Sequence, residues 1–204
     1  MKRLAITFCL TISLAIGSFG VGWSGDFQKG ADAYEKGDYA TAFREWKPLA
    51  DQGDASAQHN LGVMYDEGYG VLQDHKAAVK WYTLAAEQGL DYAQFNLGWM
   101  YYNGENVNKD VFKAFELYKM ATDFGHPRAM FNLANMHFSG TGTVKDLKMA
   151  YKLFLKSRMN GVKESDYFIE EITNQLKPEE LNLLNSEFES LIEKKIVMPV
   201  TNNQ

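Results

Sequence analysis

Four histidines are the side chains of this sequence that are best suited to metal binding or proton transfer. They are His59, His75, His126 and His137. A zinc site built on one helix needs two histidines a turn apart, as in H-E-x-x-H, and no such pair occurs. The histidines therefore predict no metal site.

Nucleophiles and paired carboxylates also form no catalytic pattern. The single cysteine, Cys9, lies in an apolar N-terminal segment, and no G-x-S-x-G, S-x-x-K or Walker sequence is present. The adjacent carboxylates Glu170-Glu171 and Glu179-Glu180 would point apart on a helix, as is typical of solvated faces and helix starts. The sequence therefore predicts no catalytic residue, no cofactor and no enzyme.

The composition predicts a globular chain with a sizeable core. Of 204 residues, 46% are hydrophobic and 23% are charged, which excludes disordered, collagen-like and low-complexity classes. Lys and Arg number 21 against 26 Asp and Glu, for a formal net charge of −5. Because there is no surplus of cations to neutralise phosphates, nucleic acid is not expected as a partner.

The N-terminal segment has the layout of a secretory signal peptide. Lys2 and Arg3 precede an apolar run over residues 4–16, and small residues follow. We expect residues 1–24 to be cleaved, which places the protein in the periplasm or outside the cell and leaves no stable membrane span. The alternative is an uncleaved anchor, although a span needs about 20 apolar residues. Cleavage would also remove Cys9, the only cysteine.

One motif recurs three times at a fixed step of 36 residues. Residues 57–62, 93–98 and 129–134 are AQHNLG, AQFNLG and AMFNLA. The same step links a set of turn glycines and a set of aspartates, namely Gly68, Gly104 and Gly140, and Asp74, Asp110 and Asp146. A fixed step of this length is typical of stacked supersecondary units.

Each unit is expected to form two helices. Ala57, Leu61 and Met64 recur at helical spacing, and Gly68 supplies the positive φ that ends a helix. Asp74 is a suitable N-cap for the second helix. No strand is predicted before Gly68-Tyr69-Gly70 and no GK[ST] follows it, so we interpret this segment as a helix turn and not as a phosphate loop.

The repeats divide the chain into segments. Residues 25–53 are expected to form an N-terminal capping helix pair, and residues 54–161 to form three 36-residue repeats. C-terminal capping helices are expected over residues 162–195, where Pro178 is suited to the first position of a helix. They would cover the open end of the stack, because the last repeat has no neighbour. Residues 196–204 are expected to form a flexible tail.

The repeated residues resemble the Sel1-like repeat family, a branch of the tetratricopeptide-type helical repeats. The resemblance rests on A-x-x-x-L-G-x-x-Y-x-x-G-x-G-V-x-x-D over residues 57–74. It continues with K-A-x-x-W-Y-x-x-A-A-E-x-G over residues 76–89, with one residue of shift at Lys-Ala. The chain departs from this pattern at Ala134, at His137 and at Asn106-Val107, which replaces the G-x-G-V turn. His137 stands where the motif has a core tyrosine, so we expect it to be buried.

This resemblance implies an all-α fold. The expected architecture is a right-handed α-solenoid of stacked antiparallel helix pairs with a C-terminal capping helix. Members that resemble this chain are mostly adaptor or scaffold proteins, several of them exported by bacteria.

By resemblance to tetratricopeptide units, five positions of each first helix would face a concave groove. The predicted partner-binding residues of the middle and third repeats are Tyr92, Phe95, Trp99, Tyr102, Asn103, Arg128, Asn135 and Phe138. Alternatively, these aromatics fill the space between successive first helices. Packing is the favoured interpretation for Phe95 and Phe131, and exposure is favoured for Trp99, Tyr102 and Asn135.

An asparagine recurs at one position of each first helix. Asn60, Asn96 and Asn132 are separated by the repeat step. A row of amides could bind the main chain of a peptide, whereas the favoured interpretation is hydrogen bonding to a neighbouring helix or turn.

The sequence predicts a non-catalytic scaffold or adaptor of the cell envelope that binds a protein or peptide in its groove. The partner would belong to the envelope or to a host, and candidate roles include regulating an envelope sensor, assembling an envelope machine or contacting a host. One alternative is an enzyme that acts on cell-wall material, β-lactamase-like or peptidoglycan-binding. Another is a structural subunit that self-associates weakly through the ends of the solenoid.

Overall fold

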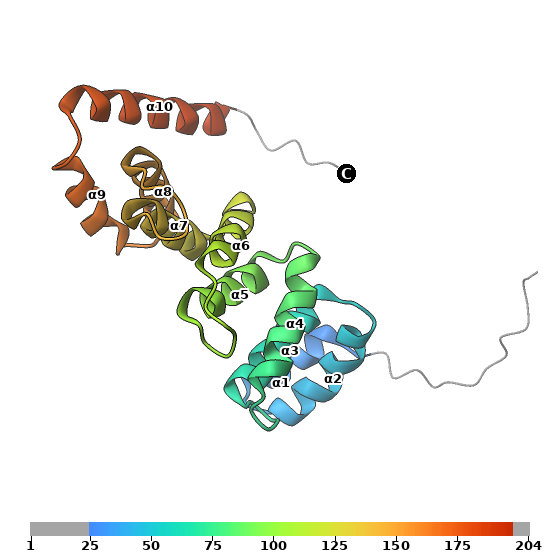
Figure 1. Ribbon diagram of the computed structural model, residues 1–204. Coiled ribbons are helices and arrows are strands. Elements are labelled where there is room, and N and C mark those ends of the chain that lie inside the picture. The colour runs from blue at the N-terminus through green and yellow to red at the C-terminus, as the bar shows by residue number, and fades with distance from the viewer. Residues whose placement is uncertain (1–24, 198–204) are drawn as a thin grey trace, which may run out of the picture.

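The chain folds into helices alone over the residues that the structure, a computed structural model, describes. These are residues 25–197, with side chains described to Ser190 (Figure 1). The predicted signal segment and residues 198–204 of the predicted tail lie outside them. The ten helices of the described part are α1 Phe27–Glu35, α2 Tyr39–Asp51, α3 Ala55–Glu67, α4 His75–Glu87, α5 Asp91–Asn103, α6 Val111–Asp123, α7 Pro127–Ser139, α8 Leu147–Met159, α9 Ser165–Thr173 and α10 Pro178–Val197. None of these described helices is long and apolar enough to cross a membrane.

Aspartate caps and glycine stops set the bounds of the repeated helices. Asp74 accepts the backbone N–H of Ala77 at 3.1 Å, and Asp110 accepts that of Lys113 at 3.0 Å, so each second helix begins with a satisfied donor. At the other end, Gly68 closes α3 with a left-handed φ of 73°. These caps are the ones that the sequence predicts.

The turn of the middle repeat keeps its shape although it lacks the second glycine. Gly70 and Gly142 have φ of 71°, and Asn106 takes the same left-handed conformation with φ of 62°. Asparagine tolerates this region better than other residues with a Cβ. The departure from the motif at Asn106-Val107 therefore leaves the turn unchanged.

Small residues let the two helices of a repeat approach closely. A Cβ on Gly62 would lie 2.6 Å from the ring of Tyr82, and one on Gly98 would lie 3.0 Å from the ring of Tyr118. Ala134 occupies the equivalent position in the third repeat and is fully buried. The core of each repeat thus forms around an aromatic ring laid against a helix backbone.

Successive pairs stack into a solenoid. Each second helix packs against the first helix of its own pair and also against the first helix of the next pair, from α1 through α9. Figure 1 shows the pairs following one another along the molecule, so the fold is an all-α helical repeat solenoid. No single pair could bury its own apolar side, and each neighbour completes the core of the one before it.

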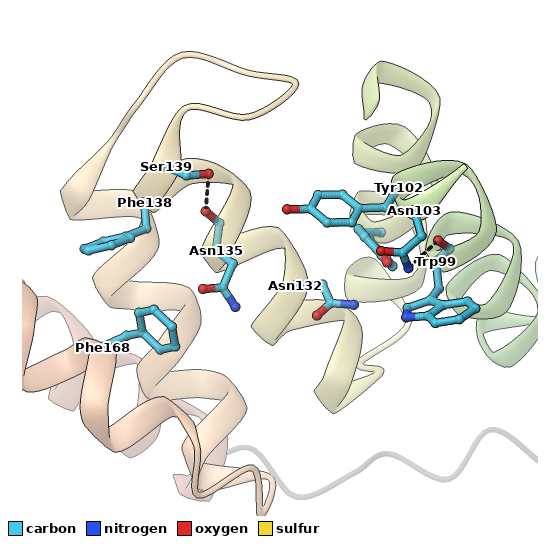
Figure 2. A pocket seen from close by; sticks show the side chains of 9 residues that line it. Trp99, Tyr102, Asn103, Asn132, Asn135, Phe138, Ser139 and Phe168 are labelled. Carbon is cyan, nitrogen blue, oxygen red and sulfur yellow. Dashed lines mark hydrogen bonds between the residues drawn. The ribbon is translucent and has the colours of Figure 1, made fainter. Parts of the chain in front are cut away.

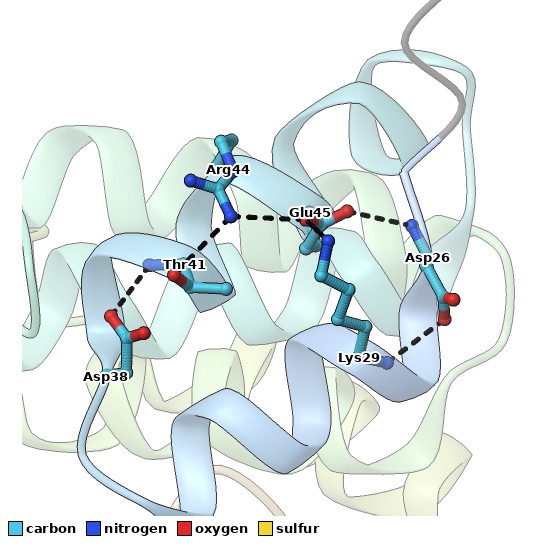
Figure 3. Close-up of polar contacts among 6 residues, drawn as sticks. All are labelled: Asp26, Lys29, Asp38, Thr41, Arg44 and Glu45. Carbon is cyan, nitrogen blue, oxygen red and sulfur yellow. Dashed lines mark hydrogen bonds and ion pairs between the residues drawn. The ribbon is translucent and has the colours of Figure 1, made fainter.

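The N-terminal pair is shorter and is held by one carboxylate (Figure 3). Glu45 of α2 accepts the backbone N–H of Asp26 at 3.3 Å and pairs with the Lys29 ammonium at 2.7 Å. The hydrogen bond from Lys29 is the main reason that the pKa of Glu45 lies below its ordinary value. Trp46 donates from Nε1 to the carbonyl of Phe27 at 3.1 Å, which ties α2 to the start of α1.

The C-terminal helices α9 and α10 both pack on α8, the last helix of the third repeat. Phe168 of α9 stacks on Phe154 of α8 with ring centroids 4.8 Å apart. The hydroxyl of Tyr151 in α8 donates to Asn185 of α10 at 2.9 Å, and Leu184 is buried beside it. In Figure 1, α10 runs back along the molecule from the end of α9.

Candidate functional site

A hollow of about 400 Å³ opens between the first helices of the middle and third repeats (Figure 2). We call it the main hollow, and its lining comes from α5, α6, α7 and α9. The lining residues are Trp99, Tyr102, Asn103, Tyr118, Asn132, Asn135, Phe138, Ser139 and Phe168. Five of these lining residues are among those predicted for partner binding, namely Trp99, Tyr102, Asn103, Asn135 and Phe138.

Two aromatic walls face each other across the main hollow. Figure 2 shows Trp99 and Tyr102 of α5 on one side, and Phe138 of α7 with Phe168 of α9 on the other. Trp99 keeps 44% of its surface exposed, and Phe138 meets Phe168 edge to face at 5.6 Å. Exposed aromatic surface of this kind is what protein interfaces favour.

Asn132 and Asn135 lie between the two walls, and Asn103 lies beside Tyr102 and Trp99 (Figure 2). The Asn135 amide nitrogen donates to the carbonyl of Phe131 at 3.2 Å, and that of Asn103 donates to the carbonyl of Trp99 at 3.0 Å. Both side chains are therefore fixed to their own helices, and their oxygens are left to accept another hydrogen bond. The Asn132 amide lies beside the Tyr118 hydroxyl, but among the described residues the two do not reach ordinary hydrogen-bond geometry.

Two further hollows continue the main one along the same face. The second, of about 160 Å³, shares Trp99 and Asn132 with the main hollow and is also lined by Phe95 and Arg128. The third, of about 520 Å³, shares Arg128 with the second and includes Tyr92. We call the three together the groove.

All eight residues predicted for partner binding line the groove. The main hollow takes Trp99, Tyr102, Asn103, Asn135 and Phe138. The second hollow takes Phe95 together with Trp99, Arg128 lines the second and third hollows, and Tyr92 lines the third. Their role in binding remains a prediction, because no partner is present.

The predicted division between packing and exposed aromatics can be compared with these positions. Phe95 and Phe131 are half-buried, and Phe95 stacks on the His126 ring at 4.5 Å. Trp99 is exposed, whereas Tyr102 and Asn135 are half-buried at the wall and floor of the main hollow. Both kinds of aromatic therefore contribute to one surface.

The sequence analysis did not place Phe168 in the groove. Helices α3, α5 and α7 begin 36 residues apart, at residues 55, 91 and 127, whereas α9 begins at Ser165, which is 38 residues after α7. The fixed step therefore fails at this helix. Its apolar residues at 168, 169 and 172 show a helical face, but not which neighbour that face meets.

In the row of asparagines, the amide at one repeat boundary has a histidine ring as its partner, whereas the amide at the next boundary does not. Asn96 Nδ2 lies 3.2 Å from His59 Nε2, and His59 Nδ1 lies 3.3 Å from Asn60 Oδ1. A neutral ring with its hydrogen on Nδ1 satisfies both contacts, and burial lowers the pKa of His59 in favour of that neutral form. At the next boundary Phe95 takes the place of His59, so Asn132 has no ring nitrogen to bond.

The hydroxyl of Tyr118 is the other unsatisfied group at the main hollow. Tyr118 is only 1% exposed, and its hydroxyl has no hydrogen-bond partner among the described residues. Burial raises the pKa of this phenol, and the nearby Asn132 side chain opposes the rise without reaching hydrogen-bond geometry. Because a buried polar group without a partner costs free energy, this part of the hollow favours a ligand with hydrogen-bonding groups.

Charged side chains are absent from the lining of the main hollow but are present in the other two hollows. The nine residues that line the main hollow are uncharged. Lys109 Nζ lies 5.7 Å from the ring centroid of Tyr102, and Lys145 Nζ lies 5.6 Å from that of Phe138, so an ammonium group stands at the edge of each wall. The second hollow adds Arg128 and Glu164.

The histidines are spread over separate structural roles. His126 caps α7 by accepting the N–H of Ala129 at 3.1 Å, and His75 lies 2.9 Å from Asp66. His137, expected to be buried, is half-buried against Phe115. Within the described residues, no three of the His, Cys, Asp and Glu side chains converge to hold a metal ion. The groove itself offers apolar contact and amide hydrogen bonds.

The solved structures that are similar to this chain include two repeat proteins. A Sel1 repeat protein from Oxalobacter formigenes is 30% identical with a TM-score of 0.68, and the match covers 71% of this chain and 59% of that one. A protective antigen present in uropathogenic Escherichia coli strains, which displays an SLR fold, is 33% identical with a TM-score of 0.67. That match covers 72% of this chain and 32% of the antigen, so the present chain spans less than two thirds of either relative. A search of curated proteins gave no match.

The family model of the Sel1 repeat matches three consecutive segments, residues 55–90, 91–126 and 127–162. Together these segments make up just over half of the 204 residues. The fold of such repeats is generally a scaffold for protein–protein interaction, and proteins built from them are typically not enzymes. The chain belongs to the Sel1 repeat family.

Proposed function

We propose that this protein is a non-catalytic scaffold that holds a segment of a partner protein in the groove. The observation that carries the proposal is the main hollow, where exposed and half-buried aromatics from three first helices surround uncharged amides. Solenoids present such extended concave surfaces without changing shape. A rigid surface of this kind loses little entropy when a partner binds.

Trp99 is the residue that we expect to contribute most to binding. It lines both the main and the second hollow, and its exposed face can still be buried by a partner. Truncating a central aromatic anchor typically costs about 2 kcal/mol or more, which is roughly a 30-fold loss of affinity. The surrounding amides and edge charges would give specificity more than affinity.

We further propose that the scaffold works in the periplasm or outside the cell. The support is the N-terminal sequence, in which Lys2 and Arg3 precede an apolar run and small residues. The partner would then be a protein of the cell envelope or of a host. Cell fractionation and N-terminal sequencing of the native protein test this location, and an intact Met1 or a cytoplasmic pool would contradict it.

Affinity capture tests the scaffold itself. The full chain, tagged at its C-terminus, is expressed in its native cells and isolated with its bound proteins from detergent-treated envelopes. We expect Trp99→Ala to lose at least nine-tenths of the captured partner while keeping the helical circular dichroism of the wild type. Phe112→Ala is the matched control, because Phe112 is an aromatic that is 71% exposed on α6 and lies outside all three hollows.

The two results that would contradict the proposal are distinct. Equal capture by Trp99→Ala and wild type would mean that the partner binds elsewhere. Loss of helicity in Trp99→Ala would mean that Trp99 belongs to the core and is not a binding residue.

A further inference from the structure

We propose that the main hollow accepts an extended peptide segment with one large apolar side chain and an Asp or Glu beside it. This inference rests on the proposed function and deepens it, because it names the chemistry of the partner. It follows from the size of the hollow, its unsatisfied polar groups and the charges at its edges.

The size of the hollow favours a peptide segment over a helix. Its volume of about 400 Å³ is near the lower end of typical ligand pockets, which run from about 300 to 1,000 Å³. A helix is roughly 10–12 Å across, so a single turn of it would already fill or exceed this volume. The walls of Trp99 and Tyr102 on one side and Phe138 and Phe168 on the other suit one aromatic or large aliphatic side chain between them (Figure 2).

The polar groups of the hollow favour a main chain that is free to hydrogen-bond. The Asn132 amide and the buried Tyr118 hydroxyl lie close to each other but, among the described residues, form no hydrogen bond of ordinary geometry, and Asn135 has a free oxygen. An amide side chain both donates and accepts, as a peptide unit does. Main-chain groups within a helix already bond one another, whereas those of an extended segment are available.

The repeat register explains why the Asn132 amide differs from the Asn96 amide of the repeat before it. At the boundary between α3 and α5, His59 Nε2 lies 3.2 Å from Asn96 Nδ2, so the Asn96 amide already has a partner. At the boundary between α5 and α7, Phe95 stands at the position of His59 and stacks on His126 instead. The substitution of a phenyl ring for an imidazole thus leaves the Asn132 amide available to a ligand.

The charges at the edges favour an acidic neighbour for the apolar side chain. Lys109 and Lys145 stand over the two aromatic walls, and the ion pairs of the described residues use other lysines, such as Lys148 and Lys152. The lining of the hollow contains no carboxylate. These two ammonium groups, beside a hollow whose lining has no carboxylate, would attract an Asp or Glu side chain.

The experiment selects ligands from a synthetic library of random ten-residue peptides with amidated C-termini, so that carboxylates come only from side chains. The full chain is the bait, and the affinity of each selected peptide is measured by fluorescence anisotropy. We expect selected peptides to carry a large apolar residue within two positions of an Asp or Glu.

Asn132→Ala should weaken the binding of these peptides about fivefold, as the loss of one or two hydrogen bonds does. Lys109→Ala/Lys145→Ala should weaken them about tenfold at low salt and less at high salt.

The matched control variants replace residues of the same kinds, an asparagine and two lysines, at exposed positions outside the hollows. Asn108→Ala changes an exposed loop asparagine, and Lys119→Ala/Lys156→Ala changes two exposed lysines outside the hollows, so neither should alter affinity by more than about twofold. N-methylation of the peptide amide next to the apolar residue should weaken binding to the wild type but add little to the loss in Asn132→Ala. That non-additivity identifies a hydrogen bond to the main chain.

Three outcomes would overturn the inference. They are no enrichment at all, enrichment of basic or uncharged peptides, and acidic peptides whose affinity is unaffected by Asn132→Ala. If any of these occurred while Trp99→Ala still lost the native partner, the scaffold would stand and only the chemistry assigned to its ligand would be wrong.

Discussion

His59 and Phe95 occupy one position in successive first helices, and the difference between them determines which asparagine amide has a ring nitrogen as its partner. The His59 ring fills its boundary by contacting both Asn60 and Asn96. Phe95 has no polar atom to offer Asn132. One side chain therefore distinguishes a repeat boundary whose asparagine amide is paired from the boundary at the candidate binding site.

The burial of His59 makes stability depend on pH. Burial lowers the pKa of His59 below its ordinary 6.5, so the unfolded chain binds a proton at a higher pH than the folded chain does. Its contribution is complete above pH 6.5 and is lost as pH falls towards the lower, folded pKa. We expect the free energy of unfolding, measured with urea, to fall between about pH 7 and pH 5.

The comparison variant for this effect is His59→Phe, which introduces the residue of the next repeat. Burial also lowers the pKa of His126 and His137, and these two histidines remain in both proteins. The free energy of unfolding of the variant should therefore still fall with pH, but less steeply than that of the wild type. If the free energy of unfolding fell equally steeply with pH in both proteins, protonation of His59 would not be what destabilises the fold.

Gly62 tests the close approach of the two helices within a repeat. A Cβ at this position would lie 2.6 Å from the Tyr82 ring, so Gly62→Ala should destabilise the protein by about 1–3 kcal/mol through overpacking. Gly98→Ala should cost less, because its Cβ would lie 3.0 Å from the Tyr118 ring. Chemical denaturation measures both, and a neutral or stabilising Gly62→Ala would contradict this packing.

At the scale of the helix, the bounds depend on caps that recur with the repeat. Asp110 begins α6 by accepting the N–H of Lys113 at 3.0 Å. We expect Asp110→Ala to lower the free energy of unfolding by about 1 kcal/mol, as the loss of an N-cap does. Asn108→Ala, two residues earlier in the exposed loop, should change it by less than about 0.5 kcal/mol. Equal effects of the two substitutions in urea unfolding would mean that the cap does not stabilise α6.

These local signals explain why the repeated helices are predictable from sequence. Apolar spacing, Asp caps and Gly stops coincide at the same step, and each acts within a few residues of the chain. Even where the motif fails at Asn106, a residue that tolerates left-handed backbone takes over. The start of α10 at Pro178 is likewise predictable, because proline favours the first position of a helix.

The contacts between helices are less predictable, because they depend on the register of the stack. Helix α9 is offset by two residues from the repeat step, and its Phe168 lies in the wall of the main hollow. Likewise, Asn96 and Asn132 are equivalent in sequence but differ in the residue that the preceding repeat presents to them. The positions of the eight predicted groove residues follow from the repeat, whereas the open polar floor requires the packed structure.

At the scale of the whole molecule, the solenoid is a row of units that touch mainly their neighbours. We therefore expect damage to stay local. Trp46 is buried between α1 and α2, and Trp46→Ala should cost about 3–5 kcal/mol in that pair. Hydrogen exchange should then show lost protection in α1 and α2 and near-normal protection in α7 to α9. A uniform loss over all helices would indicate one cooperative unit.

The same linear plan separates stability from binding. The N-terminal pair is stabilised by Glu45 and Trp46, whereas the main hollow is built from α5, α6, α7 and α9. A partner held in the groove would contact several consecutive repeats at once. The groove could therefore align a partner along the molecule without any change in the helices.

The most direct test of the account places a photo-crosslinking phenylalanine analogue at Tyr102 in one variant and at Phe112 in another. Both are expressed in native cells and irradiated, and crosslinked peptides are identified by mass spectrometry. A groove that binds a partner should give crosslinks to one protein from position 102 and none above background from position 112. Crosslinks from position 112, with none from position 102, would place the partner on α6 outside the groove and contradict the central claim.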